Sequence, residues 1–246
     1  MVEIKINTLA VLQARMSSSR LPGKVMKKIN GKPMIYYQIN RILSSKKIDK
    51  LIVATSVDES DDILSDYLIS QEVEVYRGDL FNVLSRFTEI EKLVKPSAII
   101  RLTADCPFTM PHLIDQMIVE FYERKVDYLS NTLELTFPDG VDIEIIKYGV
   151  LEKLNCLELT EGEKEHVTLG IVNNRNLFST FNFSNTTDLS HYRWTVDTEE
   201  DFSFVSKIFN HFKDDEIIFT FNNLLEFFNK FPEKNLIYVR NQHKSP

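Results

Sequence analysis

The chain has 246 residues, of which 43% are hydrophobic and 26% are charged, and its formal net charge is −7 at pH 7. These values are typical of a globular protein with a substantial core, and the negative charge argues against non-specific binding of a nucleic-acid polymer. Two cysteines, Cys106 and Cys156, are too few for a disulfide framework or a zinc site. No apolar run approaches the roughly 20 residues of a membrane helix, and the first residues lack the apolar core of a signal peptide. We therefore expect a cytoplasmic protein with no membrane partner.

Strand and helix patterns alternate through the first half of the chain. Short apolar runs predict strands at 8–13, 51–54, 73–76 and 98–102. Apolar residues at helical spacing predict helices at 34–43, 61–69 and 82–94 and one that begins at Pro111. This alternation predicts an α/β fold with a doubly wound, mostly parallel sheet.

The alternation of strand and helix patterns changes after about residue 128. A turn is expected at 137–140, strands at 141–146, 178–183 and 192–197, and helices at 159–173 and 222–231. Another helix follows Thr198, which is a suitable N-cap because acidic residues fill the next turn. With no internal repeat and no low-complexity linker, residues 1–246 are expected to form a single domain with a late insertion at 139–175 and a flexible tail at 241–246.

A cationic loop follows the first predicted strand. It carries Arg15, Arg20 and Lys24 within ten residues, with three serines between them and a Pro22-Gly23 turn before the lysine. Open α/β sheets place ligands at the carboxyl ends of their strands. Two guanidinium groups, an ammonium and several backbone N–H groups suit a polyphosphate. The alternative is a solvated basic loop that pairs with acids elsewhere.

Two aspartates also follow predicted strands. Asp105 comes after strand 98–102, and Asp197 ends strand 192–197. Carboxylates beside a polyphosphate would repel it unless a hard cation lies between them, and Mg²⁺ suits that arrangement. Each aspartate could instead cap a helix, and for Asp197 taken alone that interpretation is slightly favoured.

The first loop resembles a known family. Residues 14–24 (Ala-Arg-Met-Ser-Ser-Ser-Arg-Leu-Pro-Gly-Lys), followed by Gly31-Lys32-Pro33, are similar to the signature of CMP-sugar synthetases, and most similar to the spore-coat polysaccharide branch. Further similar motifs occur in the same order at 77–86, 103–107, 138–144, 165–168 and 195–198. Two local departures are Ser17-Ser18-Ser19 and Lys164, where the branch pattern has a glycine and an arginine.

The resemblance implies transfer of a cytidylyl group from CTP to a sugar hydroxyl, with release of pyrophosphate. Arg15, Arg20 and Lys24 would hold the phosphates, and Asp105 and Asp197 would hold Mg²⁺. The matched motifs imply nine further substrate contacts, from Ala14, Ser19, Gly23, Arg77, Asp79, Thr103, Glu144, Glu165 and His166. Of these, Glu144, Glu165 and His166 would face the sugar, although His166 could equally be a histidine on a helix face. The resemblance also implies a homodimer formed around 139–175.

Other functions stay open at this stage. A sugar-1-phosphate nucleotidyltransferase usually has a Gly-x-Gly-x-Arg loop after its first strand, and a related glycosyltransferase would need an Asp-x-Asp motif; neither is present. A non-catalytic nucleotide-binding homologue is a third alternative. The sugar is not identified, and Lys147, Arg175 and Arg193 are all available to bind a sugar carboxylate. Cys106 is interpreted as a small packing residue.

Overall fold

The computed structural model describes residues 7–212 and 219–231, so the tail predicted at 241–246 lies outside the described residues. The elements of the first half follow the predicted alternation. They are β1 (Thr8–Gln13), η1 (Lys24–Met26), β2 (Lys28–Ile29), β3 (Lys32–Pro33), α1 (Met34–Leu43), β4 (Lys50–Ser56), η2 (Glu59–Asp61), α2 (Asp62–Ser70), β5 (Glu74–Gly78), α3 (Val83–Val94), β6 (Ala98–Thr103) and α4 (Pro111–Arg124). The second half contains shorter elements: β7 (Tyr128–Ser130), β8 (Glu144–Lys147), α5 (Val150–Asn155), α6 (Glu161–Glu165), α7 (Leu169–Asn173), β9 (Thr180–Asn182), α8 (Glu199–His211) and α9 (Phe221–Lys230).

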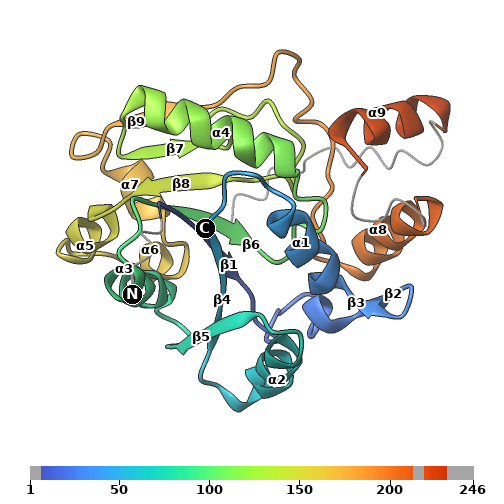
Figure 1. Ribbon diagram of the computed structural model, residues 1–246, viewed down its shortest axis with the longest axis horizontal. Coiled ribbons are helices and arrows are strands. Elements are labelled where there is room, and N and C mark those ends of the chain that lie inside the picture. The colour runs from blue at the N-terminus through green and yellow to red at the C-terminus, as the bar shows by residue number, and fades with distance from the viewer. Residues whose placement is uncertain (1–6, 213–218, 232–246) are drawn as a thin grey trace, which may run out of the picture.

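The central sheet has the strand order β5-β4-β1-β6-β8-β7-β9 (Figure 1). Strands β5, β4, β1 and β6 are parallel, whereas β8 runs antiparallel to both β6 and β7. The chain leaves β1 toward β4 and β5 and then returns to place β6 on the other side of β1. The order therefore reverses between β1 and β6, and in doubly wound sheets such a reversal opens a ligand crevice at the carboxyl ends of the strands. The predicted mostly parallel, doubly wound sheet is confirmed.

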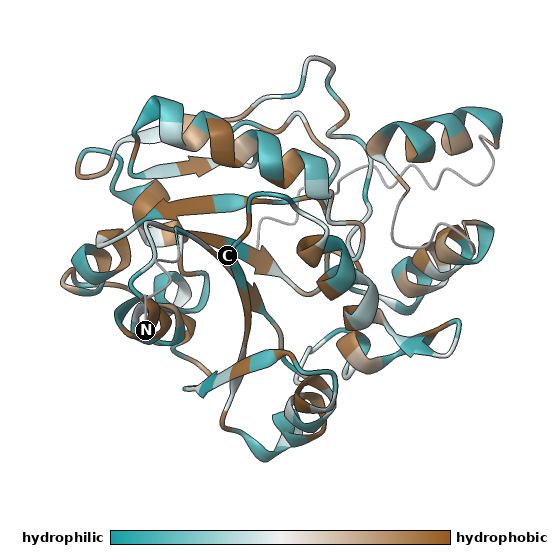
Figure 2. Ribbon diagram, viewed as in Figure 1, coloured by the Kyte–Doolittle hydropathy of each residue, from teal (hydrophilic) through white to brown (hydrophobic). Residues whose placement is uncertain are grey.

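Both faces of the sheet are buried under helices. Along β1, Ala10 and Leu12 face a core shared with α1, α2, α4 and α8, while Leu9 and Val11 face a second core shared with α3, α5 and α7. This alternation follows from the two-residue period of a strand. Figure 2 shows the resulting pattern, with hydrophobic strands in the middle and helices whose hydrophilic sides face outward.

Two predicted elements differ in the structure. The single helix expected at 159–173 is divided into α6 and α7 at residues 166–168, where Val167 has a φ of 48°, a left-handed conformation that a continuous helix does not allow. The strand expected at 192–197 is an extended segment with only an isolated bridge between Arg193 and Asp139. It packs against the turn at 137–140 and not into the sheet.

Gly140 makes the close packing of that turn possible. Its φ is +105°, and a Cβ atom built on it would lie 2.4 Å from the backbone nitrogen of Thr195 and 2.5 Å from the carbonyl carbon of Trp194. Asp139 N donates to Tyr192 O at 3.0 Å, so two backbone segments lie directly against each other here. Since the segment 192–197 ends at Asp197, this contact fixes the position of one predicted site residue.

We expect Gly140→Ala to lower the free energy of unfolding by at least about 3 kcal/mol, because backbone strain adds to a contact with backbone atoms that cannot move aside. The matched control is Gly31→Ala, where φ is +79° but no atom lies within 4 Å of the added Cβ. That control should cost only about 1 kcal/mol. Denaturant unfolding of both variants checks the difference, and equal losses would contradict this account of Gly140.

Candidate active site

The loop after β1 is held in place by its own backbone. Ala14 N donates to Ala54 O of β4 at 3.1 Å, Met16 N donates to Asp61 Oδ1 at 2.6 Å, and Gly23 N donates to Met16 O at 2.8 Å. Asp61 is itself buried. The loop is therefore a fixed structure at the carboxyl edge of the sheet, and its cations are presented from defined positions.

This loop and the ends of β1 and β6 enclose a cavity of about 250 Å³. Most of the predicted site residues line it. They are Ala14, Arg15, Ser19, Arg20, Lys24, Thr103, Asp105, Glu165, His166 and Asp197. The structure thus brings together residues from four distant parts of the chain at the place where the strand order reverses.

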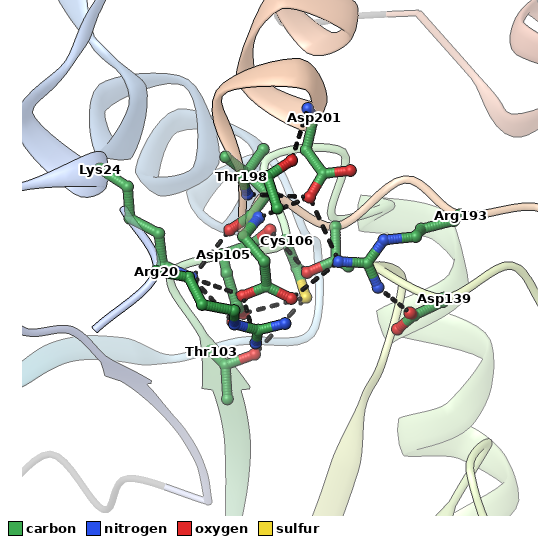
Figure 3. A network of polar contacts seen from close by, with 12 residues as sticks. Arg20, Lys24, Thr103, Asp105, Cys106, Asp139, Arg193, Thr198 and Asp201 are labelled. Atoms are coloured by element: carbon green, nitrogen blue, oxygen red, sulfur yellow. Dashed lines mark hydrogen bonds and ion pairs between the residues drawn. The ribbon is translucent and has the colours of Figure 1, made fainter. Parts of the chain in front are cut away.

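The centre of the cluster is Lys24, which is 8% exposed. Its Nζ donates to Val196 O at 2.7 Å, to Asp197 Oδ1 at 3.0 Å and to Asp105 Oδ2 at 3.3 Å. Figure 3 shows Lys24 and Arg20 on one side of the two carboxylates and Arg193 on the other side. Lys24 was predicted to contact phosphates directly; in this structure its three donors face the two acids and a carbonyl.

Asp197 is surrounded by three cations. Arg20 lies 3.0 Å from its Oδ1, which also accepts from Lys24, and Arg193 Nη2 donates to its Oδ2 at 2.8 Å. Burial by itself would raise the pKa of Asp197, but Lys24, Arg193 and Arg20 together hold that pKa below its ordinary value. The carboxylate is therefore ionised at neutral pH.

Asp105 is more open to the cavity. Its side chain is 30% exposed, and its carboxylate accepts from Lys24 and, at 3.5 Å, from the thiol of Cys106. Among residues 7–212 and 219–231, no group of three or more His, Cys, Asp and Glu side chains is placed to hold a metal ion. Two carboxylates that face one shared point nevertheless suit a hard divalent cation whose remaining ligands come from phosphate and water.

Glu165 and Arg15 meet across the mouth of the cavity. Arg15 Nη2 donates to Glu165 Oε1 at 3.0 Å, and both side chains are partly exposed. The two residues were predicted for different parts of the substrate, phosphate and sugar. The structure instead places them opposite each other, where an exposed ion pair of this kind contributes little stability and can exchange partners.

A second cavity of about 320 Å³ adjoins the first and shares Arg101, Thr103 and His166 with it. Glu144 lines this second cavity, as predicted for a residue facing the sugar side. Glu144 is buried and accepts from Tyr128 OH at 2.6 Å, from Thr168 Oγ1 and from Arg101 Nη1. It therefore holds one wall of the cavity together and has few acceptor positions left.

Arg101 and Gln13 are wall residues that sequence reasoning missed. Arg101 lies on β6 between the two cavities, and its Nη2 donates to Gln13 Oε1 at 3.1 Å. One signal was present, because an arginine in the middle of an apolar strand is seldom buried without a purpose. Glu144 as its partner could not be inferred, since the two residues meet only when β8 pairs with β6.

Three predicted substrate contacts lie outside both cavities. Arg77 donates to Ser56 O at 2.8 Å and pairs with Asp62, and Asp79 accepts from the backbone of Phe81 and Asn82 at the start of α3. Gly23 does not line either cavity and instead provides the left-handed turn before Lys24, with a φ of 70°. In this structure these residues shape the loops around the site.

Comparison with known proteins identifies the family. Residues 9–244 match the family model described as Cytidylyltransferase, so the chain belongs to the cytidylyltransferase family, a class of nucleotidyltransferases. Among its relatives is the spore coat polysaccharide biosynthesis protein SpsF of Bacillus subtilis, which is 36% identical over 209 residues, covering 82% of this chain and 85% of that protein. Both the expected family and the enzymatic class are confirmed.

Two further similarities support the same family. A 3-deoxy-manno-octulosonate cytidylyltransferase of Syntrophotalea carbinolica is 32% identical over 114 residues, 46% of this chain and 45% of that protein. The solved structure of a cytidylyltransferase from Leptospira borgpetersenii has a TM-score of 0.86 with 29% sequence identity, covering 98% of both chains. The likeness to this structure therefore extends through nearly the whole chain.

Cys106 lies beside Asp105 but is unsuited to nucleophilic chemistry. It is buried, and burial together with the carboxylates of Asp105 and Asp142 raises the pKa of its thiol well above the ordinary value. The thiol therefore stays protonated at neutral pH. The interpretation of Cys106 as a packing residue agrees with this environment.

We expect iodoacetamide to alkylate the native protein at Cys156, which is exposed, and to leave Cys106 unmodified near neutral pH. Mass spectrometry of the intact protein and its peptides checks this. Cys156→Ser is the control and should take up no label until the protein is unfolded. Labelling of native Cys106 at a rate comparable to Cys156 would contradict the protonated, inaccessible thiol.

Proposed function

We propose that this protein transfers a cytidylyl group from CTP to a hydroxyl of an acidic sugar, as a step in the assembly of a surface polysaccharide. The observation that carries the proposal is the pair of adjoining cavities, one lined by the cationic loop and both aspartates, the other by polar side chains suited to a sugar. Their shared wall of Arg101, Thr103 and His166 is where the two substrates would meet.

In the proposed reaction the sugar oxygen forms a bond to the α-phosphorus while the bond from that phosphorus to the bridging oxygen breaks. Pyrophosphate leaves with the electron pair, and the hydroxyl proton is released to water. The charge that develops lies on phosphoryl oxygens, so the protein contributes mainly by positioning and charge neutralisation. Arg15 and Arg20, partly exposed at the first cavity, are placed to bind the phosphates that leave.

Asp105 and Asp197 are the residues that would hold Mg²⁺, because their oxygens converge on the point now taken by the ammonium of Lys24. A bound Mg²⁺ supplies electrophilic activation of the phosphoryl group. Lys24 lines the same cavity and, with Arg15 and Arg20, would neutralise phosphate charge there. Asp105 is the more available of the two ligands, since Asp197 already accepts from three cations.

The second cavity supports an acidic acceptor. Its polar lining includes Thr132, Asp142 and Thr168, which suit sugar hydroxyls, and Arg175, which suits a carboxylate. Of the three cations considered from sequence, Lys147 pairs with Asp127 and Arg193 pairs with three aspartates, so Arg175 is the one that lines the cavity. The names of the octulosonate and spore-coat relatives favour the same acceptor class and pathway. The homodimer stays a prediction.

Nucleotide selectivity tests the proposal most directly. Calorimetry with Mg²⁺ and each of CTP, UTP, GTP and ATP should show CTP binding at least about tenfold more tightly, equivalent to about 1.4 kcal/mol, which one or two hydrogen bonds to the base can supply. A preference for UTP or GTP would move the protein to the sugar-1-phosphate nucleotidyltransferases. Binding of CTP without pyrophosphate release across a panel of acidic sugars would favour a non-catalytic homologue.

Asp105→Asn should lower turnover by at least about 1000-fold, because a lost metal-bound carboxylate removes several kcal/mol of transition-state stabilisation. Pyrophosphate release measures the loss, and thermal unfolding should show a folded protein. Asp66→Asn, at an exposed position on α2, is the matched control and should retain full activity. Near-normal Mg²⁺-dependent turnover in Asp105→Asn would remove this residue from the mechanism.

A further inference from the structure

Arg193 forms a three-way contact with aspartates from different segments. Its Nη1 donates to Asp139 Oδ2 at 2.8 Å, and its Nη2 donates to Asp197 Oδ2 at 2.8 Å and to Asp201 Oδ2 at 3.2 Å. Figure 3 shows the guanidinium between Asp139 on one side and the start of α8 on the other. The planar guanidinium of Arg193 therefore links the turn at 137–140, the extended segment 192–197 and α8.

Each of the two outer aspartates has contacts besides those with Arg193. Asp201 belongs to the capping box of α8 and accepts from the backbone of Asp197 at 2.9 Å and of Thr198 at 3.0 Å. The backbone of Asp139 is paired with Tyr192 and Trp194 on the adjoining segment. Asp139 and Asp201 thus provide two anchors, and Arg193 directs its remaining contact at Asp197.

That contact leaves the other oxygen of Asp197 turned toward the first cavity. Asp197 Oδ2 accepts from Arg193, while Oδ1 accepts from Lys24 and Arg20. Arg193 lines neither of the two cavities, so it would act on a substrate only through Asp197. The backbone at Asp197 has further support, because Val196 N donates to Asp105 O at 2.8 Å. Removing the guanidinium of Arg193 would therefore free the carboxylate of Asp197 without displacing the backbone at Asp197.

We propose that Arg193 is a positioning residue that holds the carboxylate of Asp197 in the orientation needed at the phosphate end of the site. This inference rests on the proposed function for the role of Asp197, but the orientation itself does not depend on any substrate. Lysine cannot replace Arg193, because a single ammonium lacks the planar fork that reaches Asp139 and Asp197 together.

A double-mutant cycle separates positioning from a purely structural role. We expect Arg193→Lys to weaken CTP binding in Mg²⁺ by about tenfold and Asp197→Asn to weaken it more. The double variant should bind CTP within about twofold of Asp197→Asn alone, since Arg193 acts through that carboxylate. Arg124→Lys makes the same substitution in an exposed pair with Glu120 and should bind CTP like the wild type.

The proposal would be overturned if the two substitutions weakened CTP binding by independent factors that multiply in the double variant. Wild-type CTP affinity in either single variant would also overturn it. The crystal structure of Arg193→Gln gives a second test that needs no nucleotide. The carboxylate of Asp197, still held at Oδ1 by Lys24 and Arg20, should rotate so that Oδ2 leaves the position that Arg193 gives it, and an unchanged orientation would overturn the proposal. A wild-type protein that binds no CTP would refute the proposed function, and this crystal structure would then decide the role of Arg193 by itself.

Discussion

The site depends on a buried ammonium between two carboxylates. Lys24, Asp105 and Asp197 come from three separate strand ends or loops, and each would be costly to bury without the others, because an isolated charge out of water loses far more free energy than a hydrogen bond returns. The loop after β1, the end of β6 and the segment before α8 are therefore held to one another by their charges. Their geometry is defined before any substrate arrives.

A protein with a net charge of −7 still presents three cations, Arg15, Arg20 and Lys24, at its first cavity. Acidic residues are not excluded from the site. Asp197 is surrounded by Arg20, Lys24 and Arg193, which together hold its pKa below the ordinary value. A preorganised set of this kind needs little rearrangement when charge develops in a reaction.

A buried polar wall joins the two halves of the site. Arg101 and Glu144 lie on neighbouring antiparallel strands, and Glu144 also accepts from Tyr128 and Thr168. Each member of such a network restricts the others, so the pairing of β6 with β8 positions this wall. The short strands β7 and β8 thus extend the sheet to Tyr128 and Glu144, which line the second cavity.

The local sequence pattern was enough to predict the longer strands and helices of the first half, the cationic loop and the place of Asp105 after a strand, because apolar periodicity and loop chemistry act over a few residues. The extended segment before Asp197, the division between α6 and α7, and the pairing of Arg15 with Glu165 or Arg101 with Glu144 were not predictable in that way. These features depend on contacts between segments that lie far apart in the chain, and Lys24 and Asp197 are separated by 173 positions. The sequence alone determined the cations of the first loop and the aspartates that accompany them, and only the tertiary structure decided which group neutralises which, because charges pair by distance in space.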